Sequence, residues 1–233
     1  MKKHILAFSL FFTGFFCLGG DGGGIKVGLK VSPGISSARV MDKDSKDGFS
    51  YSANGSKVSL LLGPCFDFPI LKNNVYFSTG VWFSLRSAQI SAKGDSAGYP
   101  SGNSNYGLQY VMLPTYFKFY TNEIVDDVRL YFNLGATFDL KISEKSSGTD
   151  GTYLMSAAHS DNKKLFAFGD ASLLLGAGVE YKLGSITLFS GLSYNRGLAN
   201  VVNPFFKTYG DHKLYQSLAI KNNLVNLDLG IQF

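Results

Sequence analysis

The chain has 233 residues, of which 17% are charged, 45% hydrophobic and 15% aromatic, with a formal net charge of +5. The charged fraction is low against about 25% for soluble domains, and the aromatic and apolar content is high enough to bury a core, which argues against disorder. Two cysteines exclude a disulfide scaffold and a thiolate zinc site. Past residue 20 no apolar run is long enough for a transmembrane helix, so a soluble β-protein and a membrane β-barrel remain.

The N-terminus has the pattern of a secretory signal peptide: two lysines precede an almost wholly apolar run over 5–18, and two glycines follow it. We predict a signal peptide over residues 1–20, cleaved near Gly20, and a single β-barrel domain over 21–233. An anchor helix is the alternative, but the apolar run is short for a bilayer span. Lipidation at Cys17 is disfavoured because two bulky phenylalanines precede it.

The charge balance after cleavage is nearly even. Removal of residues 1–20 takes away two lysines and no acid, so 20 basic and 17 acidic residues stay in the chain. No basic cluster with interleaved aromatics occurs, so we expect no nucleic-acid partner.

The body of the chain alternates apolar and polar residues with a period of two, as in strands that have one apolar face. Most of the alternating segments exceed the roughly 9–11 residues that a tilted strand needs to cross a bilayer. Eight such segments are found: 25–37, 57–68, 75–90, 107–120, 129–142, 165–182, 186–198 and 218–233.

The connections between these segments alternate strictly in length. Long, polar, Gly- and Ser-rich connections cover 38–56, 91–106, 143–164 and 199–217, and short ones cover 69–74, 121–128 and 183–185. Outer-membrane barrels have short periplasmic turns and long extracellular loops, whereas a soluble sandwich gives no reason for the rule. We therefore predict an all-β, eight-stranded, antiparallel up-and-down transmembrane β-barrel, with both termini in the periplasm.

The two faces of the predicted strands differ in the way a lipid-embedded barrel requires. On the apolar face, aromatic residues near one rim would form an interfacial girdle: Phe68, Phe77, Phe119, Phe132, Tyr181 and Phe233. The other face would line the lumen with a nearly balanced charge network: Lys26, Lys30, Asp67, Arg86, Asp139, Asp170, Glu180 and Asp228, with Lys118, Lys141 and Lys182 at the same parity.

An eight-stranded barrel is just wide enough for side chains to fill, so we expect a plug of ion pairs and no open pore. A static pair between Arg86 and Asp170 is part of this plug. Inward glycines would leave room for Trp82, Phe189 and the longer charged side chains.

The C-terminus carries a pattern typical of barrel insertion. Apolar residues occupy every second position before a terminal aromatic: Leu227, Leu229, Ile231 and Phe233. Joined to a signal peptide, this pattern predicts recognition by the barrel-assembly machinery and residence among the lipids of a Gram-negative outer membrane.

Several segments resemble the PorT-type small outer-membrane barrels, the outer-membrane protein β-barrel domain family. The resembling segments are GLKVSPGI (28–35), FSTGVWFSLR (77–86), QYVMLP (109–114) with Lys118 and TNEI (121–124), GAGVEY (176–181), YNRGLAN (194–200) and LVNLDLGIQF (224–233). The resemblance implies a membrane barrel, and more weakly a role in protein secretion, with a secretion complex or an extracellular protein as partner.

No residue pattern predicts chemistry. His159 and His212 lie in predicted loops, and adjacent loop residues do not hold a base in position for hydrolysis. A triad drawn from Ser156, Ser160, His159 and Asp161, and a calcium loop drawn from Asp42, Asp44 and Asp47, both lack the required spacing or geometry.

We therefore predict a non-enzymatic barrel with no catalytic, cofactor or metal site, with a structural, interaction or secretion-accessory role. A small passive pore and a loop-based hydrolase are the alternatives.

Overall fold

A computed structural model describes residues 24–41, 49–71, 74–94, 101–148, 164–203 and 218–233, and every regular element in these ranges is a strand. None of the described residues belongs to a helix long and apolar enough to cross a bilayer, which has no bearing on crossing by strands. The strands are β1 (Lys26–Met41), β2 (Phe49–Ala53), β3 (Ser56–Leu71), β4 (Val75–Gly80), β5 (Trp82–Gly94), β6 (Gly102–Tyr120), β7 (Val128–Gly148), β8 (Gly169–Leu183), β9 (Ile186–Gly197) and β10 (Ala219–Gln232). The predicted signal peptide over 1–20 lies outside the described residues.

In two places, a pair of consecutive strands forms a single barrel strand with a short interruption. β2 continues β3 beyond an interruption at Asn54–Gly55, and both pair with β5. β4 continues into β5 beyond Val81, and both pair with β6. Counting each of these pairs as one barrel strand, the sheet has eight strands, as the sequence predicts.

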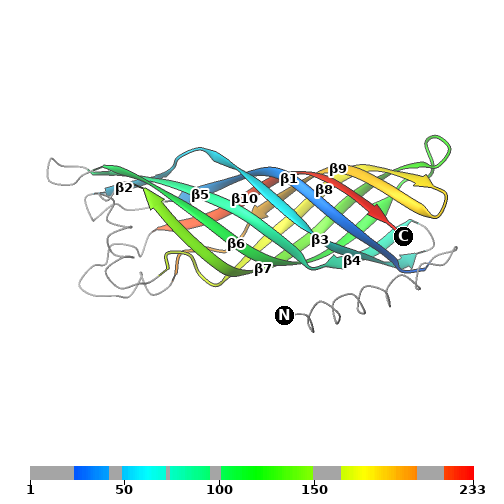
Figure 1. Cartoon of the computed structure of the whole chain (residues 1–233), viewed down its shortest axis with the longest axis horizontal. Coiled ribbons are helices and arrows are strands. Elements are labelled where there is room, and N and C mark those ends of the chain that lie inside the picture. Colours follow the sequence, from blue (N-terminus) through cyan, green and yellow to red (C-terminus); the bar gives the residue numbers. More distant parts are fainter. Residues whose placement is uncertain (1–23, 42–48, 72–73, 95–100, 149–163, 204–217) are drawn as a thin grey trace, which may run out of the picture.

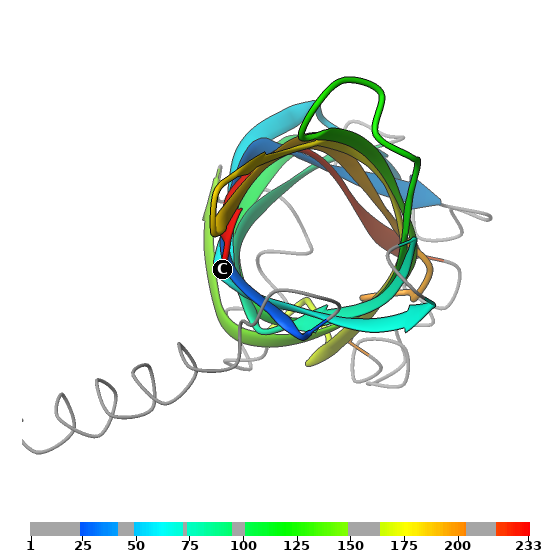
Figure 2. The ribbon, with the colours of Figure 1, turned by 90° about the vertical axis from the view of Figure 1, so that its right-hand side faces the viewer.

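The sheet closes on itself. Neighbours along the chain pair antiparallel from β6 through β10, and β1 pairs antiparallel with β10 on one side and with β3 on the other. Figure 2 shows the resulting ring end on. The antiparallel up-and-down β-barrel is therefore confirmed.

Short connections gather at the end of the barrel that carries the C-terminus (Figure 1). β8 and β9 are joined there by Gly184 and Ser185 alone. Gly184 has a φ of +63°, which suits the tight hairpin because glycine carries no Cβ. The longer connections leave from the opposite end.

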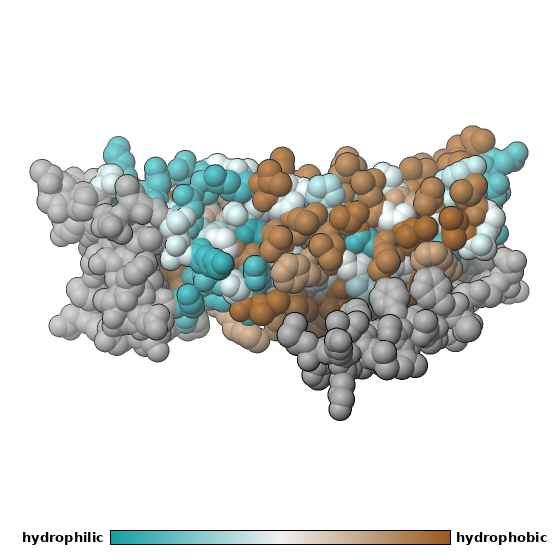
Figure 3. All heavy atoms as spheres, viewed as in Figure 1, coloured by the Kyte–Doolittle hydropathy of each residue, from teal (hydrophilic) through white to brown (hydrophobic). Residues whose placement is uncertain are grey.

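The outer face of the barrel is apolar over the half near the short turns (Figure 3). On β1 and β10 the outward side chains include Leu29 and Val31, at 41% and 43% exposed, and Leu227 at 43%. Their inward neighbours, such as Lys30 and Asp228, are buried. An exposed apolar belt of this extent, with charges on the inner side, is the arrangement that a bilayer stabilises.

Aromatic side chains cluster at the rim of this belt near the short turns. Phe68 lies opposite Phe77, and Phe119 lies opposite Phe132, in the strand register. The rings of Phe77 and Phe117 meet edge to face with centroids 6.0 Å apart. These pairs form part of the girdle predicted from the sequence.

Several strand limits differ from the sequence-based ones. The predicted loop 91–106 is largely strand, because β5 runs to Gly94 and β6 begins at Gly102, and β7 runs on to Gly148. Conversely, residues 165–168 were expected to begin a strand, but β8 begins only at Gly169. The strands thus extend beyond the apolar belt, where the ladder of β5, β6 and β7 continues with polar side chains.

Inward-facing glycines leave space for large aromatic rings, as predicted for Trp82 and Phe189. A Cβ on Gly80 would lie 2.9 Å from Nε1 of Trp82, whose indole donates a 3.1 Å hydrogen bond to the carbonyl oxygen of Pro64. A Cβ on Gly230 would collide with the Phe189 ring and with the carbonyl oxygen of Leu29. The barrel interior is therefore packed without spare room at these positions.

We expect Gly230→Ala to lower the free energy of unfolding by about 1–3 kcal/mol, because the added methyl group overpacks the interface with β1 and Phe189. Gly169→Ala is the matched control, since a Cβ there meets nothing within 4 Å. Urea unfolding in lipid vesicles measures both. Equal unfolding free energies for the two variants would contradict the packing assigned to Gly230.

Candidate functional site in the barrel lumen

The residues predicted for the lumen network lie almost entirely inside the barrel. Seven of the eight are buried: Lys30, Asp67, Arg86, Asp139, Asp170, Glu180 and Asp228. Lys26 is partly buried, with 19% of its side chain exposed. Lys118, which the alternation also assigned to the lumen, is buried. Lys182 is exposed because it lies next to the β8–β9 turn. Expecting Lys182 inside was therefore wrong.

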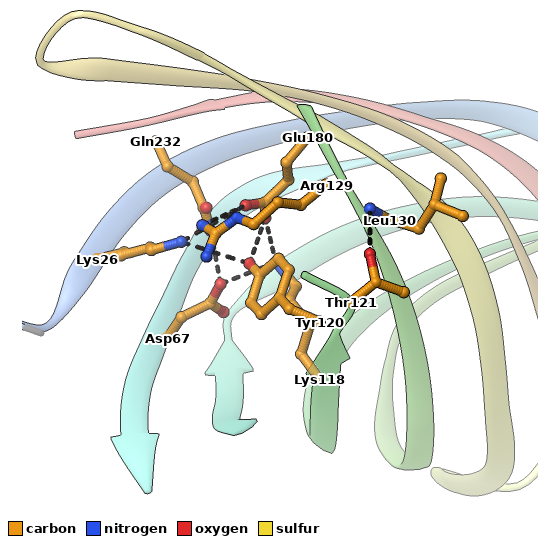
Figure 4. A network of polar contacts seen from close by, with 9 residues as sticks. All are labelled: Lys26, Asp67, Lys118, Tyr120, Thr121, Arg129, Leu130, Glu180 and Gln232. Atoms are coloured by element: carbon orange, nitrogen blue, oxygen red, sulfur yellow. Dashed lines mark hydrogen bonds and ion pairs between the residues drawn. The ribbon is translucent and has the colours of Figure 1, made fainter. Parts of the chain in front are cut away.

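Glu180 on β8 is the centre of the charge cluster nearest the short turns (Figure 4). Its carboxylate accepts a hydrogen bond from the Tyr120 hydroxyl and forms an ion pair with Lys118 on β6 at 3.2 Å. Lys26 on β1 and Arg129 on β7 approach the same carboxylate at 3.5 Å and 3.9 Å. Four strands thus bring three cations to one buried acid.

Asp67 on β3 supplies the second acid of this cluster. Lys118 lies 2.8 Å from its Oδ2, and the Gln232 amide on β10 donates to the same oxygen at 2.7 Å. Since Lys118 bridges Asp67 and Glu180, the cluster ties opposite walls of the barrel together. We call Lys26, Asp67, Lys118, Tyr120, Arg129, Glu180 and Gln232 the Glu180 cluster.

Aromatic rings surround the cations of the Glu180 cluster. Lys118 Nζ lies 5.1 Å from the ring centroid of Tyr131 and 5.4 Å from that of Phe189. Lys26 Nζ lies 4.9 Å above Tyr76. The ring faces attract the cations and also fill the space around them, and Lys118 is shielded from bulk water.

A smaller ion pair lies in the middle of the lumen. Lys30 Nζ contacts Asp228 at 2.9 Å and lies 4.2 Å above the Trp82 ring. The Ser193 hydroxyl donates to the other Asp228 oxygen at 3.1 Å. Both charges of the pair are therefore satisfied within the barrel.

Arg86 on β5 forms the next cluster toward the long connections. Its guanidinium pairs with Asp139 on β7 at 2.5 Å and with Asp170 on β8 at 3.6 Å. The sequence predicted the pair with Asp170 but not that Asp139 lies closer. The Asn222 amide donates to Asp170 at 3.1 Å, and the guanidinium lies 4.4 Å from the Tyr110 centroid.

The end of the barrel with long connections is closed by chain segments that enter it. Leu165, Phe166, Val201 and Val202 are each at most 2% exposed, and Phe166 forms a β-bridge with Val202. Glu144 on β7 accepts backbone hydrogen bonds from Leu165 at 2.9 Å and from Phe166 at 3.3 Å. We call these four apolar residues the mouth cap.

Apolar side chains surround the Arg86 cluster beneath the mouth cap, a feature that the sequence did not predict. These inward side chains include Ile90, Leu108, Tyr110, Met112, Leu174, Ile220 and Leu224. On β6 both faces carry apolar or aromatic residues, so the alternation there does not separate the inside from the outside. The inward side chains of this region pack against one another in the lumen as the core of a soluble protein does.

The predicted insertion signal forms the outer face of β10. Leu227 and Leu229 are exposed at 43% and 38%, and Leu229 and Ile231 lie opposite Val31 and Leu29 of β1. The Phe233 amide donates to the Val27 carbonyl at 2.8 Å, so the last residue completes the closing seam. Recognition of these residues by an assembly machinery stays a prediction.

The residues weighed for chemistry lie outside the described part of the chain: Asp42, Asp44, Asp47, Ser156, His159, Ser160, Asp161 and His212. Within the described ranges, no group of three or more His, Cys, Asp or Glu residues could hold a metal ion. Cys65 is buried among the lumen side chains as a free thiol.

We expect Glu180→Gln to destabilise the barrel by roughly 3–5 kcal/mol, because Lys118 then keeps Asp67 alone while the partly buried Lys26 and Arg129 lose the carboxylate that they share. Urea unfolding in vesicles, followed by tryptophan fluorescence, measures the loss. Lys182→Gln on the same strand is the control, since this lysine is exposed, and it should leave stability unchanged. Similar stabilities for the two variants would show that the Glu180 cluster adds nothing to the fold.

Several solved protein structures are similar to this chain at low sequence identity. No protein with curated annotation matches the sequence significantly. Among solved structures, OprG from Pseudomonas aeruginosa is 14% identical over 92% of this chain and 95% of its own, with a TM-score of 0.46. Neisserial surface protein A is 13% identical over 89% and 95%, with a TM-score of 0.44. The protease OmpT from Escherichia coli is 8% identical over 91% and 96%, with a TM-score of 0.42.

The sequence profile of one family matches residues 20–203, which covers most of the barrel and stops short of β10. The family's name agrees with the closed ring, the outer apolar belt and the charged interior. The chain belongs to the outer membrane protein beta-barrel domain family and resides in the outer membrane of a Gram-negative bacterium.

Proposed function

We propose that the protein is a non-enzymatic outer-membrane barrel with a solid interior, which serves as a rigid mount for its extracellular connections. We orient the barrel with the C-terminus in the periplasm, because short connections are typical of the periplasmic side and long ones of the extracellular side. Its role is then structural or interactive, with contacts to a partner made by the segments that join the strands at the extracellular end.

The burial of the lumen charges is the observation that supports this proposal. An aqueous channel keeps its lining charges in contact with water. In this barrel the side chains of Asp67 and Asp139 are 0% exposed and that of Arg86 is 2% exposed. The Glu180 cluster, the Arg86 cluster and the mouth cap lie one after another along the axis, so a solute would have to disrupt all three in order to pass.

A secretion-accessory role is the narrower form of the proposal. The resemblance of segments such as 77–86 and 194–200 to PorT-type barrels favours it. In that role the partner would be a secretion complex, and the closed lumen would rule out this barrel as the conduit for the secreted protein.

We expect no unitary conductance steps from the purified, folded protein in planar lipid bilayers, because the plug leaves no continuous water path. A mock preparation, purified in the same way from cells that lack the gene, is the control that identifies contaminating porins. Discrete ohmic steps that are absent from the mock preparation would overturn the proposal in favour of a passive pore.

We propose that the C-terminal strand is read by the barrel-assembly machinery, with Phe233 as its terminal aromatic residue. Phe233→Ser should reduce the amount of folded barrel in cells several-fold, while purified protein refolds into detergent at an unchanged rate, since the backbone bonds to Val27 persist. Heat-modifiable gel mobility measures folded protein in both settings. Phe119→Ser, an outward aromatic on the same rim, is the control that should leave assembly in cells nearly normal.

A further inference from the structure

Three cationic side chains lie together on the outer wall of the barrel, on adjacent strands. Arg39 on β1 lies directly opposite Lys221 on β10. Arg196 on β9 lies opposite Asn223 of β10, and Asn223 is the next outward-facing residue of β10 after Lys221. Directly opposite residues have Cβ atoms about 4.5–5.5 Å apart and diagonal neighbours about 7–8 Å, so the three cations form one patch. We call Arg39, Arg196 and Lys221 the outer cationic patch.

The outer cationic patch lies at the edge of the apolar belt, where the apolar Leu198, 52% exposed, follows the end of β9. The last apolar row consists of Ile35, Val225 and Tyr194, which lie side by side across β1, β10 and β9 and are 53%, 51% and 36% exposed. The next row of outward-facing residues toward the long connections contains Arg196. The row after that contains Arg39 and Lys221. The patch therefore lies at the level of lipid headgroups, directly above the hydrocarbon.

The arrangement of the patch is electrostatically unfavourable by itself. Like charges directly opposite each other on a sheet repel. No ion pair joins any of the three cations to an acidic residue in the part of the chain that the structure describes. By contrast, the cations inside the lumen have carboxylates within 4.0 Å. An anion from outside the described chain would remove the repulsion.

Arg39 is positioned for such an anion. Its Nη2 donates a 3.0 Å hydrogen bond to the carbonyl oxygen of Gly197, which holds the guanidinium across β10 and close to the strand of Arg196. Asn223, between them, accepts a 3.3 Å hydrogen bond from the Gly197 amide. Guanidinium groups present planar pairs of donors that match phosphate oxygens, and the Lys221 ammonium adds a point charge.

We propose that the outer cationic patch binds the phosphate groups of lipid headgroups in the outer leaflet, and so holds an annular lipid against β1, β9 and β10. The proposal rests on the orientation given under the proposed function, because that orientation assigns the patch to the outer leaflet. Lipid phosphate is the anion that is concentrated at this depth. The acyl chains of the same lipid would lie along the apolar belt immediately below.

We expect the triple variant Arg39→Gln/Arg196→Gln/Lys221→Gln to bind phosphorylated lipid A on the order of a hundredfold more weakly than wild type, at roughly fivefold per cation. Native mass spectrometry of the folded protein, titrated with lipid A in neutral detergent, measures the binding. Lipid A lacking its phosphates should bind wild type as weakly as phosphorylated lipid A binds the triple variant. Inorganic phosphate at the same concentration should not displace lipid A, since it lacks the acyl chains that contact the belt.

Two control variants separate this site from general charge and from misfolding. Lys93→Gln/Lys145→Gln/Lys182→Gln removes three exposed lysines elsewhere and changes the net charge equally, so it should retain wild-type affinity. Arg39→Lys/Arg196→Lys keeps the charges and should weaken binding only a few-fold. All variants are first checked for folded, heat-modifiable mobility.

The outcomes are distinct from those of the conductance test. Equal loss of lipid A binding in the two triple variants overturns the proposal, because binding would then follow net charge alone. Equal binding by the patch triple variant and wild type also overturns it. A barrel that conducts ions but still discriminates phosphorylated lipid A through these three cations would refute the proposed function and leave the lipid site intact.

Discussion

β1 hydrogen-bonds to β10 along one edge and to β3 along the other, and this double pairing leaves the sheet without a free edge. In a bilayer no water is available to satisfy an exposed backbone N–H or C=O, so a spanning sheet must close. Closure in turn separates the two faces of every strand. Odd or even position along a strand then decides whether a side chain meets lipid or the interior, and the remaining features of the molecule follow from that division.

The interior of so narrow a ring must be filled by the side chains that point into it. Long cationic side chains from β1 and β6 cross the lumen to reach Glu180, whereas Arg129 reaches it from the adjacent strand β7. Arg86 crosses from β5 to Asp139 and Asp170. Such ion pairs are poor sources of net stability in a dry interior, because desolvation offsets much of the attraction. They do fix which walls face each other, and the aromatic rings packed around them exclude the water that a channel would need.

The outer wall obeys a different rule, since within the described residues no acidic side chain forms an ion pair with the three cations of the outer cationic patch. The apolar belt ends at a row containing Val225, and cations follow directly above it on β9, β10 and β1. Inside the barrel a cation is neutralised by an acid on a facing strand. On the outer wall the neighbouring molecules supply the neutralising charge, and at that depth they are lipids. The same barrel therefore carries one set of cations for its own cohesion and another that faces its surroundings.

The closed lumen also constrains what the protein can do. The strands extend beyond the belt, as in β6 and β7, so the ends of these strands stand away from the apolar surface. Under the proposed function, a filled cylinder of this kind would transmit no solute. It can present its connecting segments at a constant height and spacing, which suits an interaction role.

The fold class and the facing of residues could be read from the sequence alone, because both depend on local periodicity. Alternation over segments such as 129–142 assigns Leu134 to the outside and Asp139 to the inside whatever the neighbouring strands are. The order of short and long connections likewise indicated an up-and-down barrel.

Which side chains pair with one another could be decided only by the tertiary structure. Register between strands decides that Arg86 lies closer to Asp139 than to Asp170, that Lys118 bridges two acids, and that Lys182 lies outside. The same holds for the mouth cap and for the outer cationic patch, since each joins residues far apart in the chain. Periodicity determines the side of a wall on which a residue lies, but only the stagger of the closed sheet determines its height and its neighbours.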